Sequence, residues 1–169
     1  NIYEPLLTLD TKLNIKPGLA ESWTQPDPKT LVFKLRRGVK FHDGTAFGAE
    51  AAKFNFNRMK SEPKSLRKGE VANIDSVDVV DANTIKVNLK KPDASLLATL
   101  TDRAGMMVSP KVIQERGAEL ERNAKGAGTK EVEYTVVPAR VSVPLTLAEE
   151  AAIANVPPLA DLQKALYEK

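Results

Sequence analysis

The stretch from Thr30 to Met59 constrains the fold of this chain more than any other. In its first seven residues, TLVFKLR, the apolar side chains Leu31, Phe33 and Leu35 alternate with Val32, Lys34 and Arg36. A period of two is typical of a strand with one buried face. An Asp-Gly pair at 43–44 follows, and this pair predicts a tight turn because glycine adopts positive φ without steric cost.

The period changes after this turn, from two residues to that of a helix. Ala52, Phe56 and Met59 lie at helical spacing, with charged and amide side chains on the other faces, which predicts a helix over 49–60. Gly48 stands at the N-cap position of this helix, where glycine is an acceptable but not a preferred residue. The sequence therefore predicts a strand and a helix joined by turns, with Val39 and Phe41 forming a short second strand between them.

The rest of the chain alternates strand and helix patterns without the βαβ rhythm of parallel sheets. We expect a helical turn within 1–9, a connector over 13–18, strands over 19–24, 71–81, 84–89 and 106–108, and helices over 94–100 and 110–116. The strands at 19–24 and 31–36 form an antiparallel hairpin in this interpretation. The predicted fold class is α+β, a mainly antiparallel sheet with flanking helices.

Composition excludes several classes of protein. The chain has 169 residues, a net charge of +3 and no cysteine, so disulfides and cysteine-based metal sites are excluded. No apolar stretch approaches the roughly 20 residues that a membrane helix needs. Basic residues are spread among acidic ones and do not interleave with aromatic residues, which argues against a nucleic-acid partner. The sequence shows no signal peptide and opens at Asn1, so we expect a processed or shortened chain.

No constellation of residues predicts catalysis. His42 is the only histidine, and one histidine without cysteine provides neither an acid–base pair nor a set of metal ligands. Ser109 lacks the flanking glycines of a nucleophile elbow. We therefore predict no catalytic residues, no metal site, no cofactor and no enzymatic activity.

A longer pattern identifies a family. The segment from Phe33 to Ala51, FKLRRGVKFHDGTAFGAEA, resembles the family 5 solute-binding proteins of ABC importers, and the segments IYEPL and KPGLAESW before it and MVSP at 107–110 agree with this resemblance. These proteins bind dipeptides, oligopeptides, glutathione or nickel chelates. The resemblance implies a subdomain of one lobe of a two-lobed binding protein, located in the periplasm or otherwise outside the cytoplasm, with an ABC permease as partner.

The resemblance also points to a ligand-contacting segment, Arg103, Gly105, Met106 and Met107. It precedes and enters a strand whose family counterpart lines the cleft between the lobes, and relatives that hold a carboxylate do so with a basic residue near this strand. Arginine suits that role because its guanidinium is a planar fork of donors. In the alternative interpretation both methionines belong to the core and Arg103 is exposed to solvent.

The last part of the chain departs from the family pattern. We expect residues 1–128 to form a partial lobe and residues 129–169 to form a divergent tail of one strand and two short helices. Leu159, Leu162 and Leu166 form an apolar stripe on the last helix. This stripe either packs against the chain's own domain or docks onto a protein partner.

Two functions follow from these observations. The first is a fragment or truncated form of an ABC-importer binding protein for peptides or similar small solutes, which binds no peptide appreciably by itself. The second is a scaffold or interaction subunit derived from such a protein, which docks through its tail.

Overall fold

The computed structural model describes residues 3–117 and 127–129 of the chain. The predicted tail, including its strand, both of its helices and the stripe of Leu159, Leu162 and Leu166, lies outside these residues. The elements are, in chain order, β1 (Leu7–Leu9), β2 (Ile15–Pro17), β3 (Ala20–Asp27), β4 (Thr30–Leu35), α1 (Ala49–Ser61), β5 (Ile74–Asp81), β6 (Thr84–Leu89), α2 (Leu96–Thr99), the 3-10 helix η1 (Arg103–Gly105) and α3 (Pro110–Arg116).

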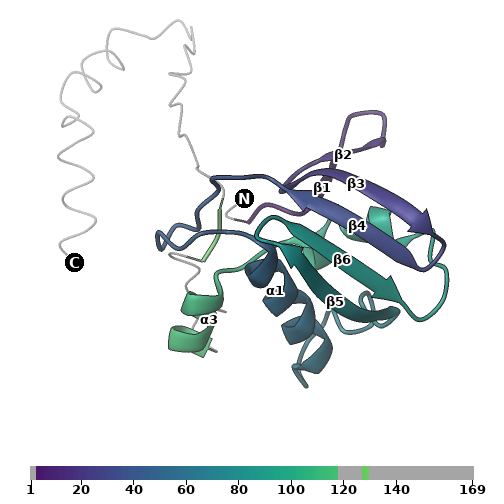
Figure 1. Ribbon diagram of the computed structural model, residues 1–169. Helices are drawn as coiled ribbons and strands as arrows, with labels where there is room; N and C mark the ends of the chain where they lie inside the picture. Colours follow the sequence, from purple (N-terminus) through teal and green to yellow (C-terminus); the bar gives the residue numbers. More distant parts are fainter. Residues whose placement is uncertain (1–2, 118–126, 130–169) are drawn as a thin grey trace, which may run out of the picture. The chain divides into compact units, whose positions relative to one another are not determined.

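A four-stranded sheet with the strand order β3–β4–β6–β5 forms the centre of the fold (Figure 1). Each of its three pairings is antiparallel, and α1 contacts β5 and β6. These elements confirm the predicted α+β class. They also confirm the hairpin of β3 and β4, although β3 runs three residues further than predicted and the turn is reduced to Pro28 and Lys29.

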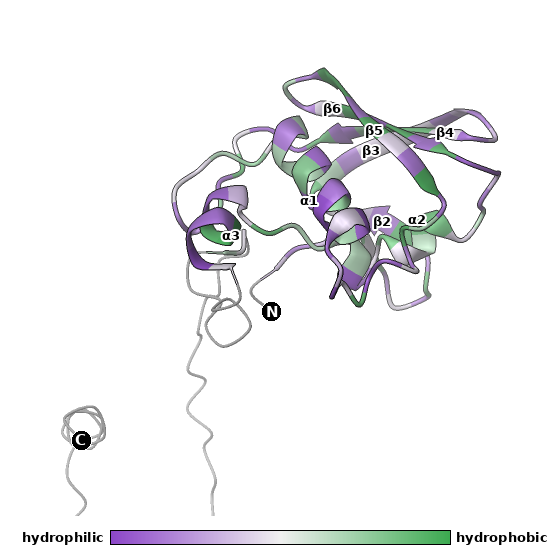
Figure 2. Ribbon diagram, turned by 90° about the horizontal axis from the view of Figure 1, so that it is seen from below, coloured by the Kyte–Doolittle hydropathy of each residue, from purple (hydrophilic) through white to green (hydrophobic). Residues whose placement is uncertain are grey.

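The core lies on one face of this sheet. On β4, Leu31, Phe33 and Leu35 are each at most 1% exposed, and the inward residues of β6 alternate in the same way (Figure 2). From α1, Phe56 and Met59 pack into the same core. Period-two strands and a period-3.6 helix therefore bury their apolar faces against each other, as the sequence predicted.

The N-terminal segment is a strand, so the predicted helical turn within 1–9 and the connector at 13–18 are wrong. β1 and β2 pair antiparallel in a hairpin. Before it, Pro5 and Leu6 accept backbone hydrogen bonds from Leu19 and Ala20. The extended form is stable here because its backbone groups find partners far along the chain, which a local pattern does not reveal.

Two further segments depart from regular strand geometry. A bulge between Ala20 and Ser22 of β3 breaks the strict alternation of faces, and Trp23 is half-buried against the core. The predicted strand at 39–41 is only an isolated bridge between Lys40 and Ala46.

The predicted strand at 106–108 is likewise wrong, because Met106 forms a single bridge with Pro5. The helix predicted over 94–100 is shorter than expected, reduced to α2. The helix predicted over 110–116 is confirmed as α3, with Ser109 as its N-cap and Gly117 after its end at φ 45°. The turn at Asp43 and Gly44 is confirmed too, since Gly44 has φ 83°.

Candidate functional site

The predicted ligand segment, Arg103–Met107, forms η1 and the extended residues that follow it. Arg103 is exposed and Met106 is half-buried, whereas Met107 has no exposed surface and belongs to the core. The structure thus places these neighbours in different environments. Met107 takes the position that the alternative interpretation expected, and its side chain is not at the surface of the described residues.

Backbone hydrogen bonds hold this segment against the N-terminus of the chain. The N–H of Leu6 donates to the carbonyl of Gly105 at 2.9 Å, and the N–H of Met107 donates to the carbonyl of Glu4 at 3.2 Å. Gly105 also lies so close to Leu100 that a Cβ atom here would be 2.6 Å from the Leu100 carbonyl carbon. A glycine is therefore required by packing at this position.

Arg103 keeps its charge available. No carboxylate among residues 3–117 and 127–129 lies within ion-pair distance of its guanidinium. A guanidinium can hold an anionic group by a forked pair of hydrogen bonds, and Arg103 is exposed with no carboxylate partner among the described residues. Ligand contact by Arg103, Gly105, Met106 and Met107 stays a prediction.

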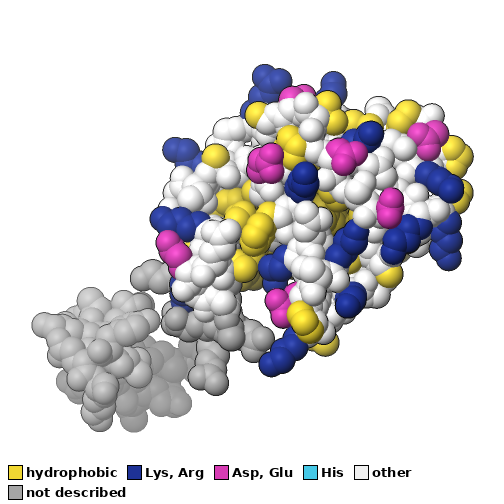
Figure 3. All heavy atoms as spheres, turned by 60° about the horizontal axis from the view of Figure 1, so that its bottom comes forward, with side chains coloured by type: hydrophobic (Ala, Val, Ile, Leu, Met, Phe, Trp, Pro, Cys, Tyr) yellow, Lys and Arg dark blue, Asp and Glu magenta, His cyan; other side chains and the backbone are white. Residues whose placement is uncertain are grey.

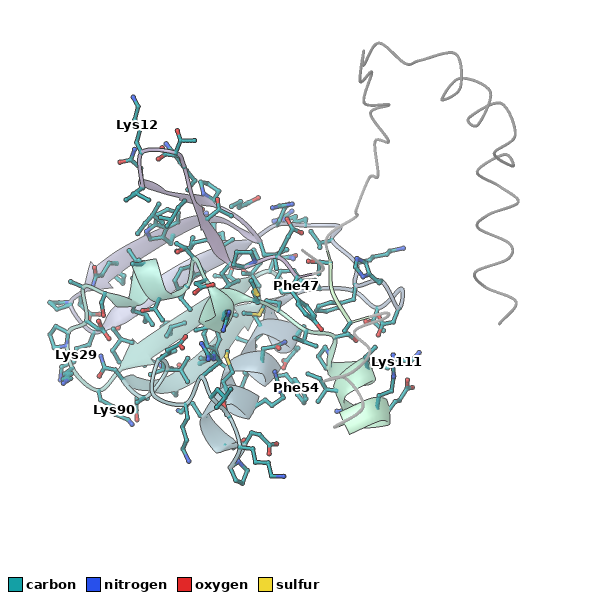
Figure 4. All side chains as sticks on the ribbon, turned by 180° about the vertical axis from the view of Figure 1, so that it is seen from behind. Lys12, Lys29, Phe47, Phe54, Lys90 and Lys111 are labelled. Carbon is teal, nitrogen blue, oxygen red and sulfur yellow. The ribbon has the colours of Figure 1, made fainter. Side chains whose placement is uncertain are left out.

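Sequence reasoning missed a pair of grooves around the first turns of α1. The first, between α1 and α3, has a volume of about 400 Å³ and is lined by Thr45, Ala46, Glu50, Ala51, Phe54, Pro110 and Lys111. Figure 3 shows hydrophobic atoms gathered in a hollow on this side of the molecule. In Figure 4, Phe54 lies on α1 and Lys111 on α3. The groove has an apolar lining with one carboxylate and one ammonium group.

The second groove lies on the other side of Glu50. It also has a volume of about 400 Å³, and its lining includes Lys40, Phe47, Gly48 and Asn83. Phe47 packs edge-on against Phe41, with ring centroids 5.8 Å apart, which fixes this wall.

One sequence signal pointed to the first groove. Phe54 is an aromatic residue that lies off the stripe of Ala52, Phe56 and Met59. An apolar residue outside the buried stripe of a helix is left at the surface unless another element covers it.

A buried serine forms the polar link between the turn at 43–45 and α3. The Ser109 hydroxyl has no exposed surface, donates to Asp43 Oδ2 at 2.5 Å and accepts from the N–H of Val112 at 3.3 Å. Thr45 donates to the other oxygen of Asp43 from its backbone at 2.9 Å and from its hydroxyl at 2.6 Å. Because the hydroxyl is buried and its partner is a carboxylate, Ser109 acts as a helix cap and not as a nucleophile.

These bonds set the charge state of Asp43. Partial burial works to raise the pKa of this carboxyl, but the hydrogen bonds from Ser109 and Thr45 and the charge of Lys111 together outweigh burial, so its pKa lies below the ordinary value of 3.8. Asp43 is therefore ionised at neutral pH, and the cluster is a structural anchor.

The short described segment at 127–129 returns to this anchor. The Ala127 carbonyl accepts from the N–H of Ser109 at 2.9 Å, and the Gly128 carbonyl accepts from the N–H of His42 at 2.8 Å. Thr129 donates to Glu4 Oε2 at 3.2 Å. His42, the only histidine of the sequence, thus lies at a backbone junction.

Within the described part of the chain there is no group of three or more acidic or histidine side chains that could hold a metal ion. Its helices include none long and apolar enough to cross a membrane.

Comparison with known proteins agrees with the sequence resemblance. The model of the family described as "Bacterial extracellular solute-binding proteins, family 5 Middle" matches residues 14–163. The sequence suggested that the family pattern ends near Gly128. The family model extends beyond that point, through most of the predicted tail at 129–169.

Three relatives illustrate the similarity. The glutathione-binding protein GsiB of Escherichia coli (strain K12) is 34% identical over 135 residues, which cover 79% of this chain and 26% of the relative. The crystal structure of NikZ from Campylobacter jejuni in complex with Ni(L-His) matches with a TM-score of 0.66 and 29% identity, over 80% of this chain and 28% of that one. NikA from Brucella suis in complex with Fe(III)-EDTA matches with a TM-score of 0.60 and 34% identity, over 65% and 23%.

The chain therefore spans about a quarter of the length of the curated relatives that it matches. Because the family model covers most of its residues and the structure has the same fold as solved members, the chain belongs to family 5 of the bacterial extracellular solute-binding proteins.

Proposed function

We propose that this chain is part of the substrate-binding component of an ABC importer, and that its residues contribute one portion of a ligand-binding lobe. The family match over residues 14–163 carries this proposal. Family 5 solute-binding proteins are non-enzymatic components of transport, and the match to this family supports a binding role for this chain.

The ligand in this proposal is a peptide or a similar small solute. GsiB is named a glutathione-binding protein, and the NikZ and NikA structures hold chelated metals. Glutathione and histidine both carry carboxylates, and Arg103 offers an exposed guanidinium with no carboxylate partner in the described part. We propose that Arg103 binds such a carboxylate, with Gly105 and Met106 beside it, and that Met107 supports them from the core.

The mechanism that follows is closure of two lobes around the solute, which shifts the protein toward the form that a permease recognises. The location is outside the cytoplasm in this proposal. These 169 residues match only about a quarter of the length of the curated relatives, so by themselves they are expected to lack most of the surface that encloses a ligand.

Two measurements test this function. The intact mass of the native protein, with the reading frames beside its gene, is expected to reveal a longer binding protein encoded next to permease and ATPase subunits. Calorimetric titration of the 169-residue chain with glutathione, dipeptides and oligopeptides is expected to show no tight binding. Tight one-to-one binding by this chain would contradict the second expectation, and neighbouring genes unrelated to transport would contradict the first.

The alternative function is a scaffold or interaction subunit that docks through Leu159, Leu162 and Leu166. Its support is the apolar stripe in the sequence. Deletion of residues 139–169 distinguishes the two roles: a docking tail predicts loss of association with a folded domain left behind, whereas a tail that belongs to the core predicts unfolding.

A further inference from the structure

The connection between α1 and β5, residues 62–73, holds the most exposed large apolar residue of the described chain. Leu66 is 85% exposed, compared with 76% for Leu13 and 60% for Val80. Single exposed leucines are common on protein surfaces, so exposure alone does not indicate a binding surface. The residues around Leu66 provide the further observations.

Leu66 is held outward by an ordered set of turns. The N–H of Ser65 donates to the Glu62 carbonyl at 3.0 Å, and the N–H groups of Glu70 and Val71 both donate to the Arg67 carbonyl, at 3.0 and 3.2 Å. Val71 has no exposed surface and anchors the connection in the core. The leucine is thus presented by a fixed backbone.

Cations outnumber carboxylates in the segment that carries this leucine, where Lys60, Lys64, Arg67 and Lys68 stand against Glu62 and Glu70. Lys64 and Lys68 are exposed, and neither has a carboxylate within ion-pair distance among residues 3–117 and 127–129. Arg67 lies between them and pairs with Glu70 at 2.5 Å.

Two more elements bring lysines to the same end of the molecule. Lys90 Nζ donates to the Ala72 carbonyl at 2.7 Å, and the N–H of Lys91 donates to Asn73 Oδ1 at 3.2 Å. Lys60 Nζ donates to the Asp75 carbonyl at 2.5 Å. In Figure 4, Lys90 lies near Lys29, on the side of the molecule away from Lys111.

We propose that this surface, Leu66 with Lys64 and Lys68 and the lysines at 60, 90 and 91, binds the surface of an anionic lipid bilayer. Lysines near an anionic membrane are attracted to its negative surface potential, and an apolar side chain that projects between them can enter the boundary between headgroups and acyl chains.

A bilayer fits this surface better than a protein partner does. A stable protein interface needs about 800 Å² on each side and an apolar core rich in aromatic residues. Here a single leucine projects from a rim of lysines, and no aromatic side chain lies within residues 60–73. A membrane requires only the insertion of that side chain and charge contacts around it.

The test is sedimentation of the 169-residue chain with vesicles of phosphatidylglycerol and phosphatidylcholine, compared with vesicles of phosphatidylcholine alone. The chain is expected to bind the anionic vesicles at low ionic strength and to be released near 1 M salt, where the screening length falls to about 3 Å. A Lys64→Gln/Lys68→Gln variant is expected to bind about 30-fold more weakly, since each lysine contributes roughly fivefold. Leu66→Ser is expected to cost about tenfold.

The hairpin of β1 and β2 supplies the matched control. Its tip holds an exposed leucine, Leu13, beside Lys12 and Lys16, so a Lys12→Gln/Leu13→Ser/Lys16→Gln variant removes the same kinds of group elsewhere. It is expected to bind as the parent chain does. Equal binding to both vesicle types, an equal loss in the control variant, or recognition of acidic proteins without any binding to anionic vesicles would overturn the proposal. Circular dichroism checks that each variant is folded.

Discussion

Substitution of Gly105 by alanine gives the sharpest test of how the segment 103–107 is built. A Cβ atom at this position would lie 2.6 Å from the carbonyl carbon of Leu100 and closer still to its oxygen. Ordinary van der Waals contact begins at 3.4 Å, so the two backbones must separate by 0.8 Å or more (3.4 − 2.6 Å). Neither backbone is free to move, because Leu100 has no exposed surface and the Gly105 carbonyl accepts from Leu6 at 2.9 Å.

The expected loss of stability follows from these two effects. Overpacking of a close contact costs about 1 to 3 kcal/mol, and the contact here is at the severe end. A stretched bond to Leu6 removes about 1 kcal/mol more. We therefore expect Gly105→Ala to lower the free energy of unfolding by about 3 to 4 kcal/mol.

Urea unfolding followed by the fluorescence of Trp23, the only tryptophan, measures this change. Gly69→Ala is the matched control, because nothing lies within 4 Å of a Cβ atom at Gly69, and its effect is expected to stay within about 0.5 kcal/mol. A Gly105→Ala chain as stable as the Gly69→Ala chain would refute the close approach of Gly105 to Leu100. A Gly105→Ala chain that fails to fold while the control folds agrees with it.

Three further changes test other parts of the structure. Asn55→Ala leaves the partly buried N–H and carbonyl of Val108 without their side-chain partner, which Asn55 meets at 3.1 and 2.8 Å, so urea unfolding is expected to show a loss of about 1 to 3 kcal/mol. Asp43 has a pKa below 3.8 in the folded protein, so its stabilising effect is complete above that value and is lost as the pH falls through the folded pKa. The free energy of unfolding should therefore decline less steeply with falling pH in Asp43→Asn than in the parent chain. An equally steep decline would contradict the bond between Asp43 and Ser109. Leu13 has φ 64° and is 76% exposed, so Leu13→Gly should relieve strain and shift the melting temperature upward by the equivalent of up to about 1 kcal/mol, whereas a clear loss would show that Leu13 is not strained.

The central strands and helices were predictable because their signals are local. β4 and β6 each carry a period-two apolar pattern, and α1 carries a period of 3.6. The buried face of each element can therefore be predicted from its own residues. The turn at Asp43 and Gly44 and the proline that opens α3 are local signals of the same kind. The family resemblance rests on this same region.

The N-terminal segment shows why other parts were not predictable. The run from Tyr3 to Leu9 has no clear period, and it is extended because Gly105, Met107, Leu19 and Ala20 provide its hydrogen-bond partners.

Contacts with distant residues also explain why the two methionines of the predicted ligand segment lie in different environments. Met106 and Met107 are identical in sequence terms, yet Met107 is fully buried and Met106 is half-buried. Their difference arises from the bridge of Met106 to Pro5 and the packing of η1 against Leu100. The groove lined by Phe54 and Lys111 likewise exists only because α3 returns near α1.

The sequence by itself determined the family, the α+β class and the buried faces of the central strands and of α1, because hydrophobic period and turn residues act within a few positions. Only the tertiary structure decided which extended segments pair, where Met107 goes and which side chains remain at the surface. Those outcomes depend on backbone partners and packing between residues as far apart as Glu4 and Thr129, and such pairings leave no periodic pattern in the chain.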